Sequence, residues 1–385
     1  MHTELIVMSE TETDPRISSL VHRKVTKWAF EDIDVNAQEE SFQEYKKYTA
    51  RKWIFMVACV IIVILVMGIA VTVGAYEIGF FESYEIIWNH LFGTITDSTK
   101  DYIVIDLRLP RIIVGIIAGA GLAVAGAVMQ STLMNPLADS YTTGVSSGAA
   151  FGATLAMTIG FTAVSGSYAI VINAFIFSLI PTAAIILVSK LKNSSPTTMI
   201  MAGIAIMYIF NACTTVLMLW ADDATLAEVY AWQVGSLGST SWDEVPVMLV
   251  AVLACTVVCC LLSKKLNVLA TGDETSRALG VDASKMRIIL LILTALLAAA
   301  VVSFTGLIGF VGMVTPHIVR LFIGADNRYL IPASALAGAA LLVTADLVGR
   351  TIISPVVLQV GVVMAFIGGP VFLWLLVRKD SKVWG

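Results

Sequence analysis

The sequence has few charged residues and lacks the common motifs of nucleotide and zinc chemistry. Only 14% of its 385 residues are Asp, Glu, Lys or Arg, whereas 58% are hydrophobic, and the mean hydropathy is +0.87. No G-x-x-x-x-G-K-[ST] phosphate loop and no H-E-x-x-H occurs, so the chain cannot by itself hydrolyse ATP by the usual route. This composition excludes a soluble domain and predicts an all-α polytopic membrane protein that is not an enzyme.

Cysteine and histidine are also sparse. The four histidines are too scattered along the chain to form a metal cluster. The five cysteines lie in apolar segments without the spacing of metal ligands, and we expect them to be small core residues. They are Cys59, Cys213, Cys255, Cys259 and Cys260. We therefore expect no metal site and no directly bound cofactor.

The apolar segments are long enough for about ten transmembrane helices, at roughly 20 residues per span. Their limits are set by apolar length and by helix breakers. The predicted spans are Trp53–Ala75, Ile112–Gln130, Thr142–Phe161, Tyr168–Val188, Thr198–Trp220, Val245–Leu262, Met286–Val302, Leu307–Ile323, Leu330–Val348 and Val357–Val377.

The distribution of Lys and Arg predicts the orientation, because cytoplasmic loops carry an excess of these residues. With an even number of spans and both termini in the cytoplasm, the inner face receives Lys46, Lys47, Arg51, Lys52, Lys190, Lys192, Lys264, Lys265, Arg277, Lys285, Arg287, Arg320, Arg328, Arg378, Lys379 and Lys382. The outer face receives only Lys100, Arg108, Arg111 and Arg350.

The N-terminus does not resemble a secretory signal, since the first apolar run begins only near Trp53. We interpret residues 1–52 as a cytoplasmic, partly disordered extension and residues 53–385 as the transmembrane domain. A regulatory role for the extension is an alternative, but a solvated tail is favoured.

On the predicted outer face, Phe81, Tyr84, Trp88 and Leu91 have the spacing of an amphipathic helix at the membrane interface. The segment 221–244 contains five acidic residues and no Lys or Arg. The few arginines of this face therefore suggest docking of an acidic partner, or snorkelling to the interface. For Arg350, pairing with Asp346 one helical turn earlier is a further alternative.

The polar stretch Ser263–Arg287 interrupts the apolar segments on the predicted inner face. Thr271 and Glu274 have the spacing of a capping box that would start a short helix, and Gly280 is placed to end it. Asp282 can then cap the following helix. We interpret this stretch as a compact docking element for a cytoplasmic partner; an ordinary inter-helix loop is the alternative.

Small residues are frequent in the second and third spans, where Gly115, Gly119, Gly126, Gly148 and Gly152 occur. Glycine lets helices approach closely in lipid, but it can also line a wide pathway. Asn135–Pro136 and Pro196–Thr197 lie at predicted cytoplasmic helix ends. They could form a constriction, or they could simply terminate helices.

Ion-coupled transporters generally carry ionisable residues deep in the membrane. Asp346 is the only such candidate, and we place it near the outer end of its span with Arg350 beside it. Energy for active transport would then come from another subunit, or the protein is a passive channel.

Five long stretches resemble the motifs of one permease family. They are RLPRIIVGIIAGAGLAVAGAVMQSTLMNPLADSYTTGVSSG (Arg108–Gly148), WQVGSL (Trp232–Leu237), GDETSRALGV (Gly272–Val281), GLIGFVGMVTPHIVR (Gly306–Arg320) and GVVMAFIGGPVF (Gly361–Phe372). In this order, they resemble the FecCD/BtuC-type membrane subunits of type II ABC importers for iron-siderophores, haem and cobalamin. The resemblance covers nearly everything after the N-terminal extension.

The resemblance implies a ten-helix subunit in a prokaryotic plasma membrane that forms a homodimer with the solute pathway at its interface. It also implies two cytoplasmic ATPase subunits that use ATP and Mg, and an extracytoplasmic substrate-binding protein. By this resemblance, the ATPase-coupling residues are Gly272, Arg277, Ala278, Leu279 and Gly280. The binding protein would dock on Arg108, Arg111 and Arg350. The cytoplasmic gate would comprise Asn135, Leu137, Pro196 and Thr197.

The sequence departs from the family pattern just before the tenth span. Many relatives have Glu and Pro there, but this chain has Val357 and Gln359, so no role of that acid carries over. From the residues alone, an ion-coupled transporter or channel is the alternative function. A membrane anchor without a transport role would leave the polar docking element and the small-residue pathway unexplained.

Overall fold

The computed structural model describes residues 35–74, 76–191 and 195–377. The chain divides into two compact units, Met1–Arg51 and Lys52–Gly385. In the first unit, the described residues form the N-terminal part of helix α2 (Val35–Thr72). Most of the predicted N-terminal extension lies outside the described residues, so its disorder and its cytoplasmic position stay predictions.

The described part of the second unit is built from helices and loops, without β-strands. The helices long and apolar enough to cross a membrane are α2, α5 (Leu109–Thr132), α7 (Ala169–Leu191), α8 (Pro196–Met218), α10 (Glu244–Leu269), α12 (Ala283–Thr305) and α14 (Asn327–Thr351). Three shorter apolar helices are α6 (Val145–Ile159), α13 (Val311–Ile323) and α15 (Val360–Val377). The remaining helical segments are α3 (Phe80–Leu91), α4 (Ser98–Tyr102), the π-helical η1 (Ile103–Arg108), α9 (Asp223–Val234) and α11 (Asp273–Ala278).

Each predicted span coincides with one of the seven long helices or the three shorter ones. The all-helical, multi-span class is therefore confirmed, whereas the count of ten spans stays a prediction. Helix α2 begins at Val35, well before the predicted span start at Trp53. Another difference is at α10, which continues from the predicted end at Leu262 to Leu269. The predicted end followed the change from apolar to charged residues at Lys264. Lysine is a good helix former, so the polar boundary does not end the helix.

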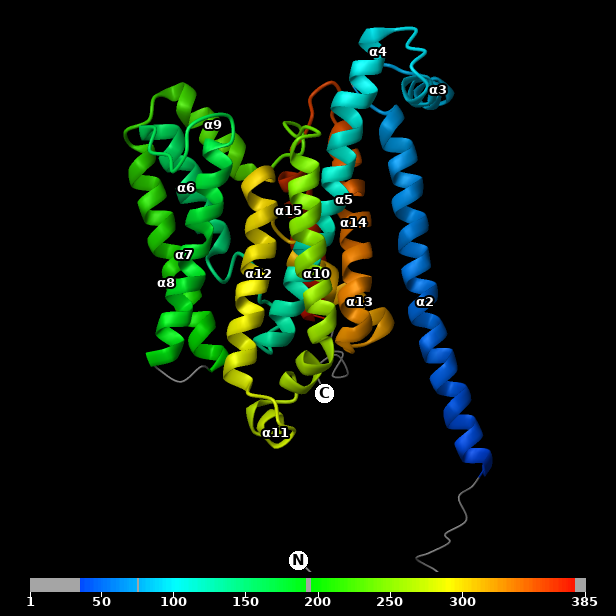
Figure 1. Cartoon of the computed structure of the whole chain (residues 1–385), viewed down its shortest axis with the longest axis vertical. Helices are drawn as coiled ribbons and strands as arrows, with labels where there is room; N and C mark the ends of the chain where they lie inside the picture. Colours follow the sequence, from blue (N-terminus) through cyan, green and yellow to red (C-terminus); the bar gives the residue numbers. More distant parts are fainter. Residues whose placement is uncertain (1–34, 75, 192–194, 378–385) are drawn as a thin grey trace, which may run out of the picture. The chain divides into compact units, whose positions relative to one another are not determined.

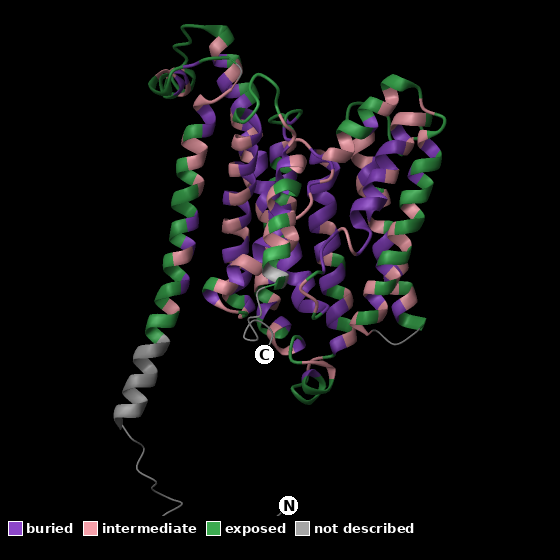
Figure 2. Cartoon of the chain, turned by 180° about the vertical axis from the view of Figure 1, so that it is seen from behind, coloured by how far each residue is buried: buried purple, intermediate pink, exposed green. Residues whose placement is uncertain are grey.

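Helix α5 lies at the centre of the second unit, and α10, α12, α13 and α14 pack against it (Figure 1). It is buried along most of its length, whereas exposed residues gather on peripheral helices such as α8 (Figure 2). A Cβ atom at Gly119 would lie 2.3 Å from the carbonyl oxygen of Gly338 in α14, and one at Gly126 would lie 1.8 Å from that of Gly312 in α13. These glycines therefore serve helix packing, the first of the two predicted uses.

The two ends of the helical unit carry different short elements (Figure 1). Helices α3, α4 and α9 lie at one end, and α11 lies at the other, between the ends of α10 and α12. These are the predicted outer and inner ends, respectively.

Helix α3 is amphipathic, as predicted. Phe81, Trp88 and Leu91 are exposed, whereas Ser83 and Ile86 are buried. Ion pairs hold α3 against α4: Lys100 contacts Glu82, and His90 Nδ1 lies 3.0 Å from Asp101 Oδ1. This geometry is typical of a helix that rests its apolar face on a membrane surface.

Replacing Gly126 with alanine should destabilise the protein, because the new Cβ would overlap the backbone of Gly312. We expect a loss of about 1–3 kcal/mol in the free energy of unfolding, as for other overpacked contacts. The measurement is denaturation of the purified protein in detergent. Gly79→Ala is the matched control, because a Cβ there makes only ordinary contacts, 3.6 Å from Glu82. Equal stability of the two variants would contradict the packing role of Gly126.

Candidate functional site

Two of the three predicted docking arginines cap the C-terminal end of α2. The guanidinium group of Arg108 donates hydrogen bonds to the carbonyl oxygens of Val71 (2.8 Å), Thr72 (2.9 Å) and Tyr76 (2.5 Å). Arg350 Nη1 donates to the carbonyl oxygens of Ala70 and Val73, both at 3.1 Å. The last carbonyl groups of a helix have no partners within the helix, and here two cations satisfy them.

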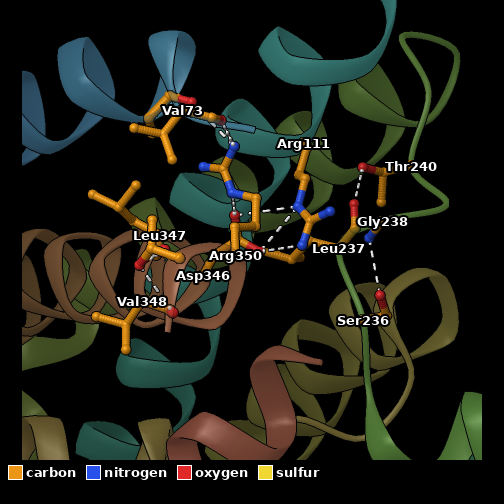
Figure 3. Close-up of polar contacts among 12 residues, drawn as sticks. Val73, Arg111, Ser236, Leu237, Gly238, Thr240, Asp346, Leu347, Val348 and Arg350 are labelled. Carbon is orange, nitrogen blue, oxygen red and sulfur yellow. Dashed lines mark hydrogen bonds and ion pairs between the residues drawn. The ribbon is translucent and has the colours of Figure 1, made fainter. Parts of the chain in front are cut away.

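Arg111 and Arg350 share the carboxylate of Asp346, which is almost fully buried (Figure 3). Arg111 Nε and Nη2 donate to Asp346 Oδ1 at 3.0 and 2.7 Å. Arg350 Nε lies 3.1 Å from Asp346 Oδ2. The predicted alternative of an Arg350–Asp346 pair is therefore present. The sequence did not indicate the contact of Arg111 with Asp346, because 235 residues separate them.

The three arginines line a pocket of about 360 Å³ at the predicted outer end. Three guanidinium groups and one carboxylate give this cluster a net charge of +2. The side chain of Arg350 is 5% exposed, and its Nη2 has no hydrogen-bond partner among the residues that the structure describes. Val357 also lines the pocket, so the absence of the family's glutamate leaves the positive charge intact. The pocket is suited to an anionic group, and docking of a binding protein stays a prediction.

Helix α11 forms the centre of the predicted coupling corner, but its start differs from the prediction. The N-cap is Gly272, with φ of +103°, and the helix begins at Asp273. Thr271 does not form a capping box, because its hydroxyl group donates to the carbonyl oxygen of Val268 at 2.7 Å. The extension of α10 to Leu269 places Thr271 in the turn that closes α10.

The end of α11 is as predicted. Gly280 has φ of +79°, and the N–H groups of Gly280 and Val281 donate to the carbonyl oxygens of Arg277 (3.0 Å) and Ser276 (2.8 Å). These two bonds define a Schellman motif, which favours glycine at this position. Asp282 Oδ1 then accepts from the N–H of Lys285 at 3.1 Å and caps α12, as predicted.

The predicted coupling residues lie on one exposed corner. The residues from Arg277 to Gly280 are exposed, and the Leu279 side chain is 63% exposed. Ser276 points inward, and its hydroxyl group contacts the carbonyl oxygen of Val268 at 2.9 Å. The corner is thus a fixed projection with an apolar tip. Its contact with an ATPase stays a prediction.

Residues next to the two predicted gate segments belong to one apolar cluster. Asn135 Oδ1 accepts from the N–H of Leu137 at 2.9 Å and shapes the loop after α5. Pro196 is the first residue of α8, and Thr197 beside it is exposed. Met199, in the first turn of α8, belongs to the same apolar cluster as Leu133 and Ala138 of the loop. Asn135 and Pro136 follow the end of α5, and Pro196 begins α8, so both segments lie at helix boundaries. A constriction at these segments stays a prediction.

A larger pocket, of about 710 Å³, was not predicted from the sequence. Its lining is mainly apolar, with Asp139 and Tyr141 as the titratable side chains. The lining residues are Asp139, Tyr141, Thr142, Gln233, Val234, Leu307, Gly309, Phe310, Met313, Gly361, Val362, Ala365 and Phe366. This volume is typical of sites that hold small molecules.

Four of the five quoted motifs meet at this pocket, each contributing lining residues. The backbones touch where they meet. A Cβ atom at Gly361 would lie 1.8 Å from the carbonyl oxygen of Val234, and one at Gly306 would lie 2.1 Å from that of Trp232. The signal in the sequence was the set of motifs itself, because the residues that line the pocket belong to them.

Asp139 is held by its own loop. Its Oδ1 accepts hydrogen bonds from the N–H groups of Tyr141 and Thr142, both at 3.0 Å. The Nε2 atom of Gln233 is buried, and no described residue forms a hydrogen bond with it. A polar donor at the wall of an otherwise apolar pocket can orient a solute.

Comparisons with known proteins agree with these features. The model of the FecCD transport family matches residues 60–378. The hemin transport system permease protein HmuU of Yersinia pestis is 37% identical over 84% of this chain and 95% of its own length. The cobalamin import system permease protein BtuC of Halobacterium salinarum is 39% identical over 74% of this chain and 76% of its own.

A solved structure described as an inward-facing conformation of a metal-chelate type ABC transporter has a TM-score of 0.74 and 28% sequence identity. The match covers 84% of this chain and 98% of that chain. The family match extends over most of the sequence, and the relatives are matched over three quarters or more of their length. The chain therefore belongs to the FecCD transport family.

Proposed function

We propose that this chain is the permease subunit of a type II ABC importer that moves an iron-siderophore, haem or cobalamin-type solute inward by alternating access. The observation that carries the proposal is the meeting of four family motifs at one pocket of about 710 Å³. The printed names of similar proteins, a hemin permease and a cobalamin permease, support this solute class.

A second copy of the chain would complete the pathway. Phe366 of α15 lines the pocket and is 76% exposed, so the wall of the pocket ends at the surface of the single chain. Exposed apolar residues continue along α15 and α8, including Leu373 and Tyr208. A homodimer that joins these surfaces would enclose the pocket between two copies.

Energy would come from separate ATPase subunits bound at the corner formed by α11. The alternative, an ion-coupled transporter, needs a carboxylate that can take up and release an ion. Asp346, the sequence candidate, is instead held between Arg111 and Arg350. This pairing favours a structural role for Asp346 and supports the ATP-driven proposal.

The predicted membrane orientation places the remaining partners. Both chain ends and α11 would lie in the cytoplasm, and the pocket of Arg108, Arg111 and Arg350 would receive acidic side chains of a substrate-binding protein. Closure of two ATPase subunits would displace the α11 corners and thereby shift the pathway between outward-open and inward-open states.

Reconstitution tests the function directly. Vesicles that contain this chain, its ATPase and the binding protein should accumulate one of the three solutes only when ATP is present. An ATPase variant without its phosphate-loop lysine should abolish uptake, because that residue contacts the nucleotide phosphates. Uphill uptake by the chain alone, driven by an ion gradient, would overturn the proposal.

Gly280→Trp should abolish the stimulation of ATP hydrolysis by solute while the dimer remains intact. A non-glycine residue at a φ of +79° costs about 1–2 kcal/mol, which would distort the corner, whereas no other atom lies within 4 Å of a Cβ there. Gly280→Asn is the matched control, because Asn tolerates this backbone conformation. ATPase assays and size-exclusion chromatography provide the measurements. Normal stimulation in the tryptophan variant would argue against the coupling assignment.

Arg111→Gln should weaken binding of the substrate-binding protein about two- to fivefold at low salt, the effect of losing one partly exposed charge pair. Added salt should reduce the difference, because it screens such pairs. Lys100→Gln is the control, since Lys100 lies outside the arginine pocket and pairs with Glu82. Equal affinities of both variants and the wild type would leave Arg111 with only its structural contact to Asp346.

A further inference from the structure

The last turn of α5 contains three consecutive buried polar residues, Gln130, Ser131 and Thr132. Each makes a hydrogen bond to a different part of the protein. Polar groups in an apolar interior are expensive unless they are paired, so each bond constrains the turn strongly. We refer to Gln130–Thr132 as the α5 hub.

The first connection joins the hub to the start of α11. Arg287 of α12 is fully buried, and its Nε donates to the carbonyl oxygen of Thr132 at 3.3 Å. Its Nη1 donates to Asp273 Oδ2 at 3.0 Å, and its Nη2 contacts the other carboxylate oxygen. Hydrogen bonds from Arg287 lower the pKa of Asp273, which keeps the pair charged. One guanidinium group thus bridges the first residue of α11 and the end of α5.

The second connection starts from α10, shortly before α11. Asn267 Oδ1 accepts from the backbone N–H and from Nδ2 of Asn327, both at 2.8 Å. Ser131 Oγ in turn donates to Asn327 Oδ1 at 2.9 Å. This chain of amides therefore links α10 to α5 through the first residue of α14.

Asp326 fixes the same junction. Burial alone raises the pKa of its carboxyl group, but hydrogen bonds from Arg328 and Asn267 outweigh this effect and lower the pKa to about 2. Asn267 Nδ2 donates to Asp326 Oδ1 at 2.7 Å. Helices α10 and α12, which flank α11, are thus connected to Ser131 and Thr132, respectively, in the last turn of α5.

The third connection leads from the hub to the large pocket. Gln130 Nε2 donates to the carbonyl oxygens of Gly312 (3.3 Å) and Met313 (3.1 Å), and Arg320 contacts its Oε1. Met313 lines the pocket. The carbonyl oxygen of Gln130 also accepts from the N–H of Asn135 at 3.1 Å, in the predicted gate.

We propose that the α5 hub transmits movement of the α11 corner to the gate and the pocket, with Arg287 and Ser131 as positioning residues. This inference rests on the proposed function, since it assumes that an ATPase moves α11. Two hydrogen-bonded bridges enter the hub, one from Asp273 at the start of α11 and one from Asn267 in the preceding α10, and the hub leads directly into the predicted gate loop. A displacement of α11 must therefore move the end of α5 or break these polar contacts.

The test compares Ser131→Ala with Ser178→Ala in the complete complex of permease, ATPase and binding protein. Both serines are buried, but the hydroxyl group of Ser178 donates to the carbonyl oxygen of Phe175 within its own helix. Ser131→Ala should reduce the amount of solute transported per ATP hydrolysed by about fivefold or more, within the usual range of coupling between sites. Ser178→Ala should leave this ratio unchanged.

Asp273 provides a second variant pair on the other bridge. Asp273→Ala should lower the ratio in the same way, and Asp273→Glu should restore most of it, because the partly exposed site has room for a longer carboxylate. A fold defect alone would reduce transport and hydrolysis together, whereas the hub predicts that hydrolysis continues without transport. Size-exclusion chromatography of each complex checks assembly.

Gate movement is measured by maleimide labelling of Leu137→Cys, with the chain that carries only its five native cysteines as the background control. ATP should change the labelling of residue 137 in this background but not when Ser131→Ala or Asp273→Ala is added. The proposed role of the α5 hub would be wrong if both variants kept the wild-type ratio of transport to hydrolysis and if ATP still changed the labelling of residue 137 in both. If the unmodified complex itself shows no ATP-driven uptake, the proposed function fails instead.

Discussion

The close approach of α5 to its neighbours is the constraint on which the rest of the structure depends. Lipid offers no hydrophobic force that drives helices together, so packing must come from close contact and polar bonds. At Gly119 and Gly126, the backbone of α5 touches the backbones of α14 and α13. With larger residues, α5 could not occupy the centre, and the polar residues at its two ends could not reach their partners.

Both ends of α5 carry polar residues that join distant parts of the chain. Arg108 and Arg111 precede and begin it, near the end of α2 and Asp346. The α5 hub ends it and contacts α12, α13 and α14. One rigid helix therefore lies between the cationic pocket at one end and the gate loop at the other. Binding at either pocket, or a displacement of α11, would therefore act on α5.

The sequence predicted the apolar spans, the amphipathic α3 and the glycine turn at Gly280, because these follow from local patterns of hydrophobicity and backbone preference. It failed at Thr271, because the extension of α10 to Leu269 places this residue in the turn that closes α10. It could not indicate the contact of Arg111 with Asp346, or the meeting of the motifs at the large pocket. Those features depend on residues far apart in the chain, and no local pattern encodes them. The roles of the coupling, docking and gate residues stay predictions.

The capping of α2 has a consequence for biosynthesis. The carbonyl oxygen of Ala70 is bonded to a guanidinium group that follows it by 280 residues. While the ribosome is still making the intervening helices, that end of the first membrane helix lacks this partner and must rely on interfacial water. This junction can therefore close only after α14 has been synthesised.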